Sequence, residues 1–309
     1  MGPEPIEDAL VRMVGRAHAL ASPDERDGYE VDWTAQFRGR ARMVVRPGST
    51  AEVSACVTAC AQRGVPLVAQ GGNTGLVGGS VPDATGTAVV LSTRRLTDIG
   101  PADLLTAQVT VGAGVTLQSL QEHLRVHHFE LGIDLAARGS ATIGGMAATN
   151  AGGIHVLKHG SMRQRISGIE VVLGNGRVVS HLAGLDKDNT GYDLASLLCG
   201  SEGTLGIITA VRLRLVPIAA QRVTALIAWD GMRPMIEGLA RLRRAVPALE
   251  AAEYMVRPGV ELVLDRYQLP DPFPRPHPAY LLIEAGAEHD PSAEVASAVG
   301  SLEGVRDVA

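Results

Sequence analysis

Residues 69–79 read AQGGNTGLVGG, and five of these eleven residues are glycines. The stretch follows the apolar run VPLVA at 65–69. Because glycine loses more backbone freedom on folding than other residues, such a cluster indicates tight turns or close approach to a ligand. A surface loop that binds nothing is the alternative interpretation, and the rest of the sequence has to decide between the two.

The sequence before this loop predicts a strand, a helix and a second strand. Residues 43–45 (MVV) are apolar and β-prone, and Ser49 with Glu52 forms a capping-box pattern for a helix. Gly64 suits the position just after the end of that helix. The run at 65–69 then predicts a buried strand, so the glycine-rich loop directly follows the second strand of a strand–helix–strand unit.

Two further segments are rich in glycine: GSATIGGMAATNAGG at 139–153 and GSEGTLGIIT at 200–209. Successive backbone N–H groups in such turns form anion-binding nests, and phosphate is a common occupant. The three loops are far apart in the sequence, which favours a ligand long enough to touch all of them. No lysine follows the glycines as a Walker loop requires, and no GxGxxG is present, so a P-loop and a doubly wound NAD site are not expected.

The remainder of the chain predicts a hairpin and a second, incomplete unit. Asn175-Gly176 is a strong hairpin signal, and 206–216 alternates as a half-buried strand does. After Pro217 a strand (222–229), a helix (233–246) and a strand (279–287) follow, with room for one more helix before the chain stops. We therefore expect three parts, 1–38 as a helical lead-in, 39–218 as the glycine-loop domain and 219–309 as a second domain that is truncated.

The composition excludes several classes of protein. The chain has 309 residues, 46% hydrophobic and 20% charged, which is enough for a full core. A net charge of -5 leaves no basic surplus for binding nucleic acid. No run reaches the roughly 18 apolar residues of a membrane span, and the N-terminus lacks the apolar core of a signal peptide. Three cysteines without a CxxC pair favour a reducing compartment, from which we predict a cytoplasmic protein.

Five ordered motifs carry a resemblance to a known family. The segments PGSTAEV, VAQGGNTGLVGGSVP, GSATIGGMAATNAGG, KDNTGYDLASLLCGSEGTLGIIT and RLRLVP resemble the FAD-binding domain of the vanillyl-alcohol oxidase / p-cresol methylhydroxylase (PCMH) superfamily. Within it, the sequence is most similar to the D-2-hydroxyacid dehydrogenases, which include D-lactate dehydrogenase, the glycolate oxidase FAD subunit and D-2-hydroxyglutarate dehydrogenase. The resemblance implies an α+β protein with a PCMH-type FAD-binding domain of two α/β subdomains, followed by the start of an α+β substrate (cap) domain.

The resemblance also implies which residues hold FAD. The first loop would cradle the pyrophosphate, the second would run along the ribityl chain and flavin ring, and the third would line the adenosine end. These residues are Gly71, Gly72, Asn73, Thr74, Gly75 and Leu76 in the first loop, Ser140, Ile143, Gly144, Gly145, Thr149, Asn150, Gly152 and Gly153 in the second, and Glu202, Gly203, Ile207 and Ile208 in the third.

Neither the first nor the second loop contains a histidine or cysteine to which a flavin could be attached, so we predict non-covalent FAD. His155 and His159 are four residues apart, and His123 and His127 form a second pair with the same spacing. Relatives usually carry a tyrosine immediately before the glycine at position 160, where this chain has Lys158-His159. Two histidines on one helical turn can bind a metal. Neither pair encloses a glutamate as HExxH does, so we predict no metal site.

The predicted function is the oxidation of a D-2-hydroxy acid, of the lactate, glycolate or 2-hydroxyglutarate type, to the 2-oxo acid by hydride transfer to flavin N5. The family's later HxGDGNxH-like metal and base motif does not occur in these 309 residues, so no catalytic residue is assigned. An electron acceptor of unknown identity and a homodimer or partner subunit are the expected partners. The alternatives are a flavin-binding subunit of a larger electron-transfer complex without its own substrate site, an NADPH-dependent enolpyruvyl-sugar reductase, and a purely structural module.

Overall fold

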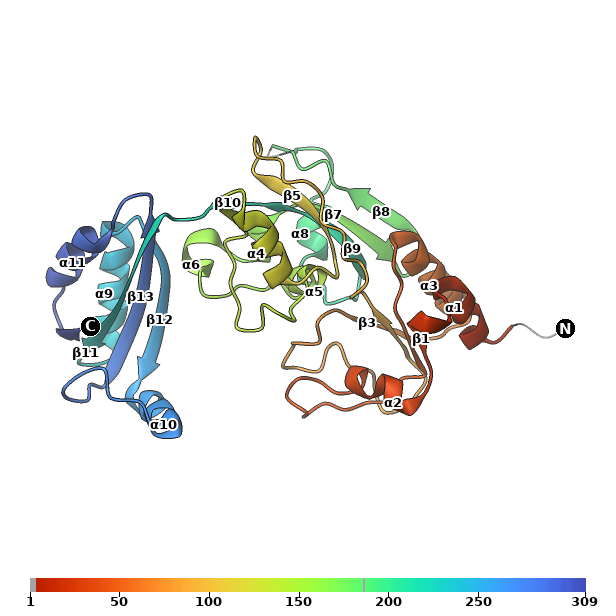
Figure 1. The fold of residues 1–309 in the computed structure, drawn as a ribbon, viewed down its shortest axis with the longest axis horizontal. Coiled ribbons are helices and arrows are strands. Elements are labelled where there is room, and N and C mark those ends of the chain that lie inside the picture. The colour runs from red at the N-terminus through yellow and green to blue at the C-terminus, as the bar shows by residue number, and fades with distance from the viewer. Residues whose placement is uncertain (1–3, 186) are drawn as a thin grey trace. The chain divides into compact units, whose positions relative to one another are not determined.

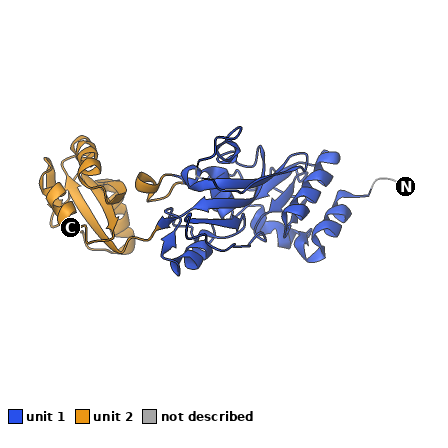
Figure 2. Ribbon diagram, turned by 90° about the horizontal axis from the view of Figure 1, so that it is seen from above, with its two compact units in different colours: residues 1–151, 161–216 blue, residues 152–160, 217–309 orange. Residues whose placement is uncertain are grey.

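The computed structural model describes residues 4–185 and 187–309 and divides the chain into two compact units. Unit 1 comprises Met1–Ala151 and Ser161–Val216, and unit 2 comprises Gly152–Gly160 and Pro217–Ala309 (Figure 2). The short segment Gly152–Gly160 therefore groups with residues that come much later in the sequence, although it directly follows the second glycine loop. Our three-part division at 38 and 218 stays a prediction.

The first sheet of unit 1 is mainly parallel and contains the predicted strand–helix–strand unit (Figure 1). Its order is β1-β2-β4-β3, with β1 antiparallel to β2. The Ser49 hydroxyl accepts a hydrogen bond from the Glu52 amide at 3.2 Å, which is one half of the predicted capping box of α3. The Glu52 carboxylate accepts from the Gly48 amide at 2.7 Å instead of the Ser49 amide. The elements, in chain order, are α1 (Ile6–Val14), η1 (Arg16–His18), β1 (Ala19–Leu20), α2 (Pro23–Arg26), η2 (Asp27–Tyr29), β2 (Met43–Val45), α3 (Thr50–Gln62), β3 (Leu67–Gln70) and β4 (Val89–Ser92).

The second sheet of unit 1 is antiparallel, with the order β5-β9-β7-β8. The predicted hairpin turn joins β7 to β8, and Gly176 has a φ of 83° there. A small pair of strands, β6 and β10, is separate from it. The elements are β5 (Gln108–Gly112), α4 (Leu117–Arg125), β6 (Phe129–Glu130), α5 (Ile143–Thr149), α7 (Met162–Arg165), β7 (Ile166–Leu173), β8 (Val178–His181), α8 (Leu194–Leu198), β9 (Gly206–Arg214) and β10 (Val216–Pro217).

Both sheets of unit 1 contribute to one hydrophobic core. Leu91 of β4, Val57 of α3, Leu120 of α4 and Val211 of β9 are all buried in the same cluster. Burial of this much apolar surface is the main force that holds the two sheets together. The shared core therefore fixes the loops that leave β3, precede α5 and precede β9.

Unit 2 is an antiparallel sheet with the order β12-β13-β11-β14 and a core of its own. The predicted strands at 222–229 and 279–287, and the helix between them, are confirmed as β11, β13 and α9. The sequence analysis missed β12, whose mixed acidic and apolar sequence LEAAEYMV has no clear alternation. The elements are α6 (Val156–His159), β11 (Gln221–Trp229), α9 (Met232–Ala245), β12 (Leu249–Val256), α10 (Arg257–Tyr267), β13 (Ala279–Ala287), α11 (Ser292–Gly300) and β14 (Val305–Val308).

The chain is thus a mixed helix-and-sheet protein, as predicted. None of the helices in the described part of the chain is both long enough and apolar enough to span a bilayer.

Candidate cofactor-binding site

The three glycine-rich loops meet at one cavity of about 1080 Å³ in unit 1. A cavity of this size is at the upper end of small-molecule sites, which are usually about 300–1,000 Å³, and it suits an extended ligand. Every predicted site residue lines the cavity except Ile143, Asn150, Gly152 and Gly153. Segments that are far apart in the sequence are therefore brought together as the extended-ligand hypothesis requires.

Glycine is needed where the first loop passes the second. A Cβ at Gly72 would lie 1.9 Å from the carbonyl oxygen of Ser140, and one at Gly71 would lie 2.4 Å from Thr142 Oγ1. Neither position can hold a larger residue without moving the backbone. These glycines, which we expected to allow close approach of a ligand, also allow the two loops to pack closely.

The first loop keeps its backbone donors available. Among the residues that the structure describes, no backbone N–H of residues 71–76 donates to another protein group. The carbonyl groups are held instead: the Arg94 guanidinium donates to the oxygens of Gly71 (3.2 Å) and Gly72 (2.9 Å). Free amides beside a cationic side chain form an environment that favours an anion.

Asn73 fixes the turn of the first loop. Its φ is 56°, in the left-handed region that asparagine tolerates better than most residues. Its side-chain amide donates to the Val31 carbonyl at 2.8 Å, and its Oδ1 accepts from the Ser80 hydroxyl at 2.8 Å. The Asn73 side chain therefore has a structural role.

The second loop differs because its donors are already used. Ile143 N donates to Val115 O at 2.8 Å, and Gly144 N donates to Ala113 O at 2.8 Å. Gly145 N donates to the Thr142 hydroxyl that caps α5. The amides at the start of α5 are therefore not available to a ligand.

The third loop completes the wall of the cavity. Glu202 has a φ of 49°, and its amide donates to Ala148 O in α5 at 2.9 Å, which ties the third loop to the second. Ile207 and Ile208 begin β9 and pair with β7, so their side chains have fixed positions. The cavity is therefore bounded by regular structure on this side.

Four predicted residues lie outside the cavity lining. Ile143 is fully buried in the core. Asn150 Oδ1 accepts hydrogen bonds from the Ser161 hydroxyl (2.8 Å) and the Arg163 amide (3.0 Å), so its side chain holds the returning chain in place. Gly152 and Gly153 belong to the segment grouped with unit 2. A contact between any of these four residues and a cofactor stays a prediction.

The sequence analysis missed the contribution of the N-terminal segment. Val31, Asp32 and Trp33 line the cavity together with Arg94. Burial opposes ionisation of Asp32, but hydrogen bonds from Thr34 and the Phe37 amide outweigh it and lower the pKa of this carboxyl. Trp33 is 73% exposed although it lies beside the cavity. A large aromatic residue in an aromatic-poor sequence is the one sequence signal that could have indicated this segment.

Comparison with known proteins agrees with this geometry. Residues 41–181 match the model of a family described as an FAD binding domain. Residues 41–181 carry an FAD-binding domain. It is 37% identical over 287 residues to a mitochondrial D-2-hydroxyglutarate dehydrogenase of Bos taurus, covering 91% of this chain and 52% of that protein. It is 34% identical over 277 residues to a D-2-hydroxyglutarate–pyruvate transhydrogenase of Saccharomyces cerevisiae, covering 87% of this chain and 54% of that protein. The chain spans about half the length of the curated relatives it matches.

Solved structures share the fold at low sequence identity. An alkyldihydroxyacetonephosphate synthase superposes with a TM-score of 0.81 at 16% identity, covering 100% of this chain and 63% of that one. A BBE-like 1 protein of Physcomitrella patens superposes with a TM-score of 0.71 at 18% identity, covering 99% of this chain and 62% of that one. These matches confirm the expected PCMH-type fold.

The prediction of a cytoplasmic protein is wrong, because several of the most similar relatives are named as mitochondrial proteins. The prediction rested on unpaired cysteines. Cysteine usage reports the redox conditions around a protein, whereas import into an organelle depends on separate targeting segments.

Proposed function

We propose that this chain is the FAD-binding part of an enzyme that oxidises a D-2-hydroxy acid to the corresponding 2-oxo acid, with D-2-hydroxyglutarate as the substrate. The relatives that are 37% and 34% identical are named for reactions of D-2-hydroxyglutarate. The single observation that carries the proposal is the cavity, where free amides of the first loop and Arg94 are brought to the walls formed by the other two loops.

The chain's own residues bind and orient the cofactor. The amides of residues 71–76 would hold the pyrophosphate, and the Arg94 clamp on the carbonyls of Gly71 and Gly72 would keep those amides facing the cavity. The backbone of Gly144 and Gly145 would lie along the flavin, and Ile207 and Ile208 would line the adenosine end. When bound, the flavin supplies the acceptor for the hydride that leaves the hydroxy acid.

The attachment of FAD is non-covalent in this proposal. Among the residues that the structure describes, no histidine, cysteine or tyrosine lines the cavity, and these are side chains to which flavins are commonly attached. We therefore expect all flavin absorbance to remain in the supernatant when the loaded protein is precipitated with acid. Yellow colour in the precipitate would contradict this part of the proposal.

The test of the whole proposal is the visible spectrum of the purified chain after loading with FAD. We expect a structured flavin band that co-elutes with the protein, and its bleaching under anaerobic conditions by D-2-hydroxyglutarate but not by the L-enantiomer would show that this chain also contains a working substrate site. Binding without bleaching by D-2-hydroxyglutarate, D-lactate or glycolate would mean that this chain binds flavin without a working substrate site. Failure to bind FAD would overturn the proposal altogether.

A further inference from the structure

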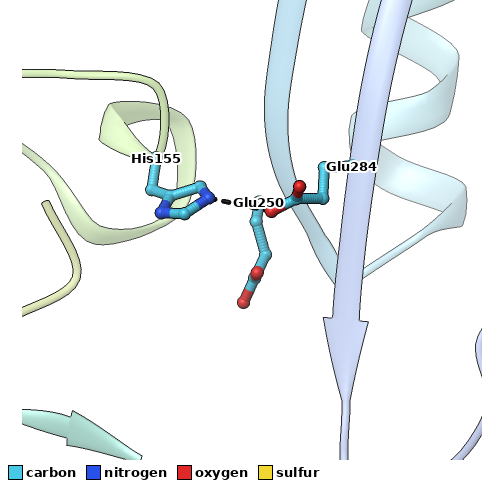
Figure 3. A group of neighbouring side chains, drawn as sticks. All are labelled: His155, Glu250 and Glu284. Carbon is cyan, nitrogen blue, oxygen red and sulfur yellow. Dashed lines mark hydrogen bonds and ion pairs between the residues drawn. The ribbon is translucent and has the colours of Figure 1, made fainter. Parts of the chain in front are cut away.

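A second group of chemically reactive side chains lies in unit 2, outside the cavity. His155 precedes α6, Glu250 lies in β12 and Glu284 lies in β13. Figure 3 shows the His155 imidazole facing the Glu284 carboxylate, with His155 Nε2 2.8 Å from Glu284 Oε1, and the Glu250 side chain beside this pair. One ligand atom from each residue lies within 4.8 Å of the other two.

Two of the three residues are buried, whereas the Glu284 side chain is 25% exposed. His155 is 5% exposed and Glu250 is 2% exposed. Gly286 makes room for the Glu250 carboxylate, since a Cβ at that position would lie 2.6 Å from Glu250 Oε2. This oxygen accepts no hydrogen bond of good geometry from the described residues, although Arg222 Nε lies 3.2 Å away as an ion-pair partner. A buried carboxylate with unused acceptor capacity therefore lies within 4.8 Å of the His155 imidazole and the Glu284 carboxylate.

Positive charges now balance these carboxylates. Lys158 Nζ lies 2.8 Å from Glu250 Oε1, and Arg222 Nε lies 3.2 Å from Glu250 Oε2 and 3.9 Å from Glu284 Oε1. A buried carboxylate requires a positive charge beside it.

The Lys158 ammonium is the cation that can be exchanged. Its side chain is 29% exposed, so it can turn towards solvent without crossing the core. A flexible ammonium makes weaker, less directional contacts than a metal ion makes with the same oxygens. A divalent ion could therefore take its place between the two carboxylates and the imidazole.

We propose that His155, Glu250 and Glu284 form a binding site for one divalent transition-metal ion, which displaces Lys158 when it binds. One imidazole nitrogen and two carboxylate oxygens suit Zn²⁺, whereas Mg²⁺ and Ca²⁺ prefer oxygen ligands alone. Nitrogen and oxygen ligands of Zn²⁺ lie about 2.0–2.2 Å from the ion. The ligand atoms of the three residues, which lie within 4.8 Å of one another, therefore have to move closer together by side-chain rotation. His159, whose Nε2 lies 3.8 Å from Glu250 Oε1, is close enough to supply a fourth ligand.

The test is a calorimetric titration of the purified chain with ZnCl₂ after treatment with a chelator. We expect one ion to bind per chain. His155→Ala and Glu284→Gln should each weaken binding by at least about 100-fold, because loss of a ligand costs more than the 10–100-fold typical of an outer-shell partner. Lys158→Met should tighten binding roughly tenfold, because the competing cation has been removed.

The Lys158 variant separates a metal site from a closed ion-pair network. In a closed network the same substitution would lower the thermal stability of the chain and leave Zn²⁺ affinity unchanged or weaker, and that result would overturn the proposal. Mg²⁺ serves as the negative control ion. His127→Ala is the matched control for removal of a histidine, because His127 is exposed on the other i,i+4 pair.

Other outcomes would also overturn the proposal. They are the absence of Zn²⁺ binding to the wild-type chain, full affinity in Glu284→Gln, and loss of binding in His127→Ala. Circular dichroism of each metal-free variant establishes that it is folded, and Glu284→Gln, which keeps the size of the side chain, serves if His155→Ala does not fold. X-ray absorption of the Zn²⁺ complex should show only nitrogen and oxygen neighbours, including at least one imidazole.

Discussion

Gly72 lies where the first glycine loop crosses the second, and Gly75 lies in the same loop with open space around it. We expect Gly72→Ala to lower the free energy of unfolding by about 1–3 kcal/mol and to abolish retention of FAD, because the new methyl group would collide with the Ser140 carbonyl. Gly75→Ala is the matched control and should change stability by less than about 0.5 kcal/mol. Urea unfolding and the flavin absorbance after gel filtration measure both effects. Equal effects of the two substitutions would show that the close approach of the loops is unimportant.

The cysteines are a second feature at the residue scale. Burial is the main cause that raises the pKa of Cys56 to about 12 and that of Cys60 to about 11, and it also raises the pKa of Cys199. Since the thiolate is the nucleophile, all three thiols should be inert in the folded protein. With Ellman's reagent at pH 8 we expect no fast reaction before denaturation and three equivalents of thiol in urea. A thiol that reacts within seconds in the native chain would contradict this.

The glycine loops behave differently as elements, although their compositions are similar. The first loop has unused amides, whereas the amides at the start of α5 donate to Val115, Ala113 and the Thr142 hydroxyl. We expect Arg94→Met to weaken FAD binding about tenfold, because the carbonyls of Gly71 and Gly72 lose their donors and the amides lose their fixed direction. Fluorescence titration with FAD measures this. Arg138→Met, a change of an exposed arginine outside the cavity lining, should leave the affinity unchanged.

The turn of the β7–β8 hairpin packs against α3, which leads to a second prediction for a single element. Gly176 has a φ of 83°, and a Cβ there would lie 1.9 Å from Thr58 Oγ1 in α3. Gly174, in the same turn, has nothing within 4 Å of its Cβ position. Gly176→Ala should therefore destabilise the chain by about 1–3 kcal/mol, while Gly174→Ala should be nearly neutral. Thermal unfolding of the two variants measures this difference in stability. A Gly176→Ala variant as stable as the unchanged chain would refute the packing of the turn on α3.

On the scale of the whole molecule, the two units have separate hydrophobic cores. One of the two tryptophans, Trp33, lies at the cavity of unit 1, and Trp229 is fully buried in unit 2. In a Trp33→Phe variant, fluorescence reports the unfolding of unit 2 alone. Because a ligand stabilises only the structure that binds it, FAD should raise the unfolding midpoint seen by circular dichroism more than the midpoint seen by Trp229. Identical shifts would show that the two cores unfold together.

The charge cluster of unit 2 predicts a dependence of stability on pH. The pKa of Glu250 is lowered from 4.5 to about 2, so the folded state binds the proton more weakly than the unfolded state does. Its contribution to stability is therefore complete above about pH 4.5 and is lost as the pH falls towards 2. In chelator-treated protein, Glu250→Gln should reduce the loss of Trp229-monitored stability over this range. Glu253→Gln, on an exposed position of the same strand, should not.

Local patterns in the sequence were sufficient for much of the fold, whereas FAD as the cofactor followed from the family resemblance that the five ordered motifs carry. The Ser49 cap, the Asn175-Gly176 turn and the alternation of β9 depend on residues close together in the chain, and short-range backbone chemistry largely determines them. The order of the glycine loops was enough to indicate an extended phosphate-containing ligand. The sequence could not reveal β12, because its mixed residues have no periodicity and its pairing with β13 is a tertiary interaction.

Only the tertiary structure decided which residues meet. It placed Trp33 and Arg94 at the cavity, showed that Gly71 and Gly72 pack against the second loop, and grouped Gly152–Gly160 with unit 2. The same grouping brought His155 to two glutamates from strands far along the chain, a cluster that no spacing rule such as HExxH could predict. The physical reason is that side-chain chemistry acts over a few ångströms in space, and only burial of the shared cores brings such distant residues within that range.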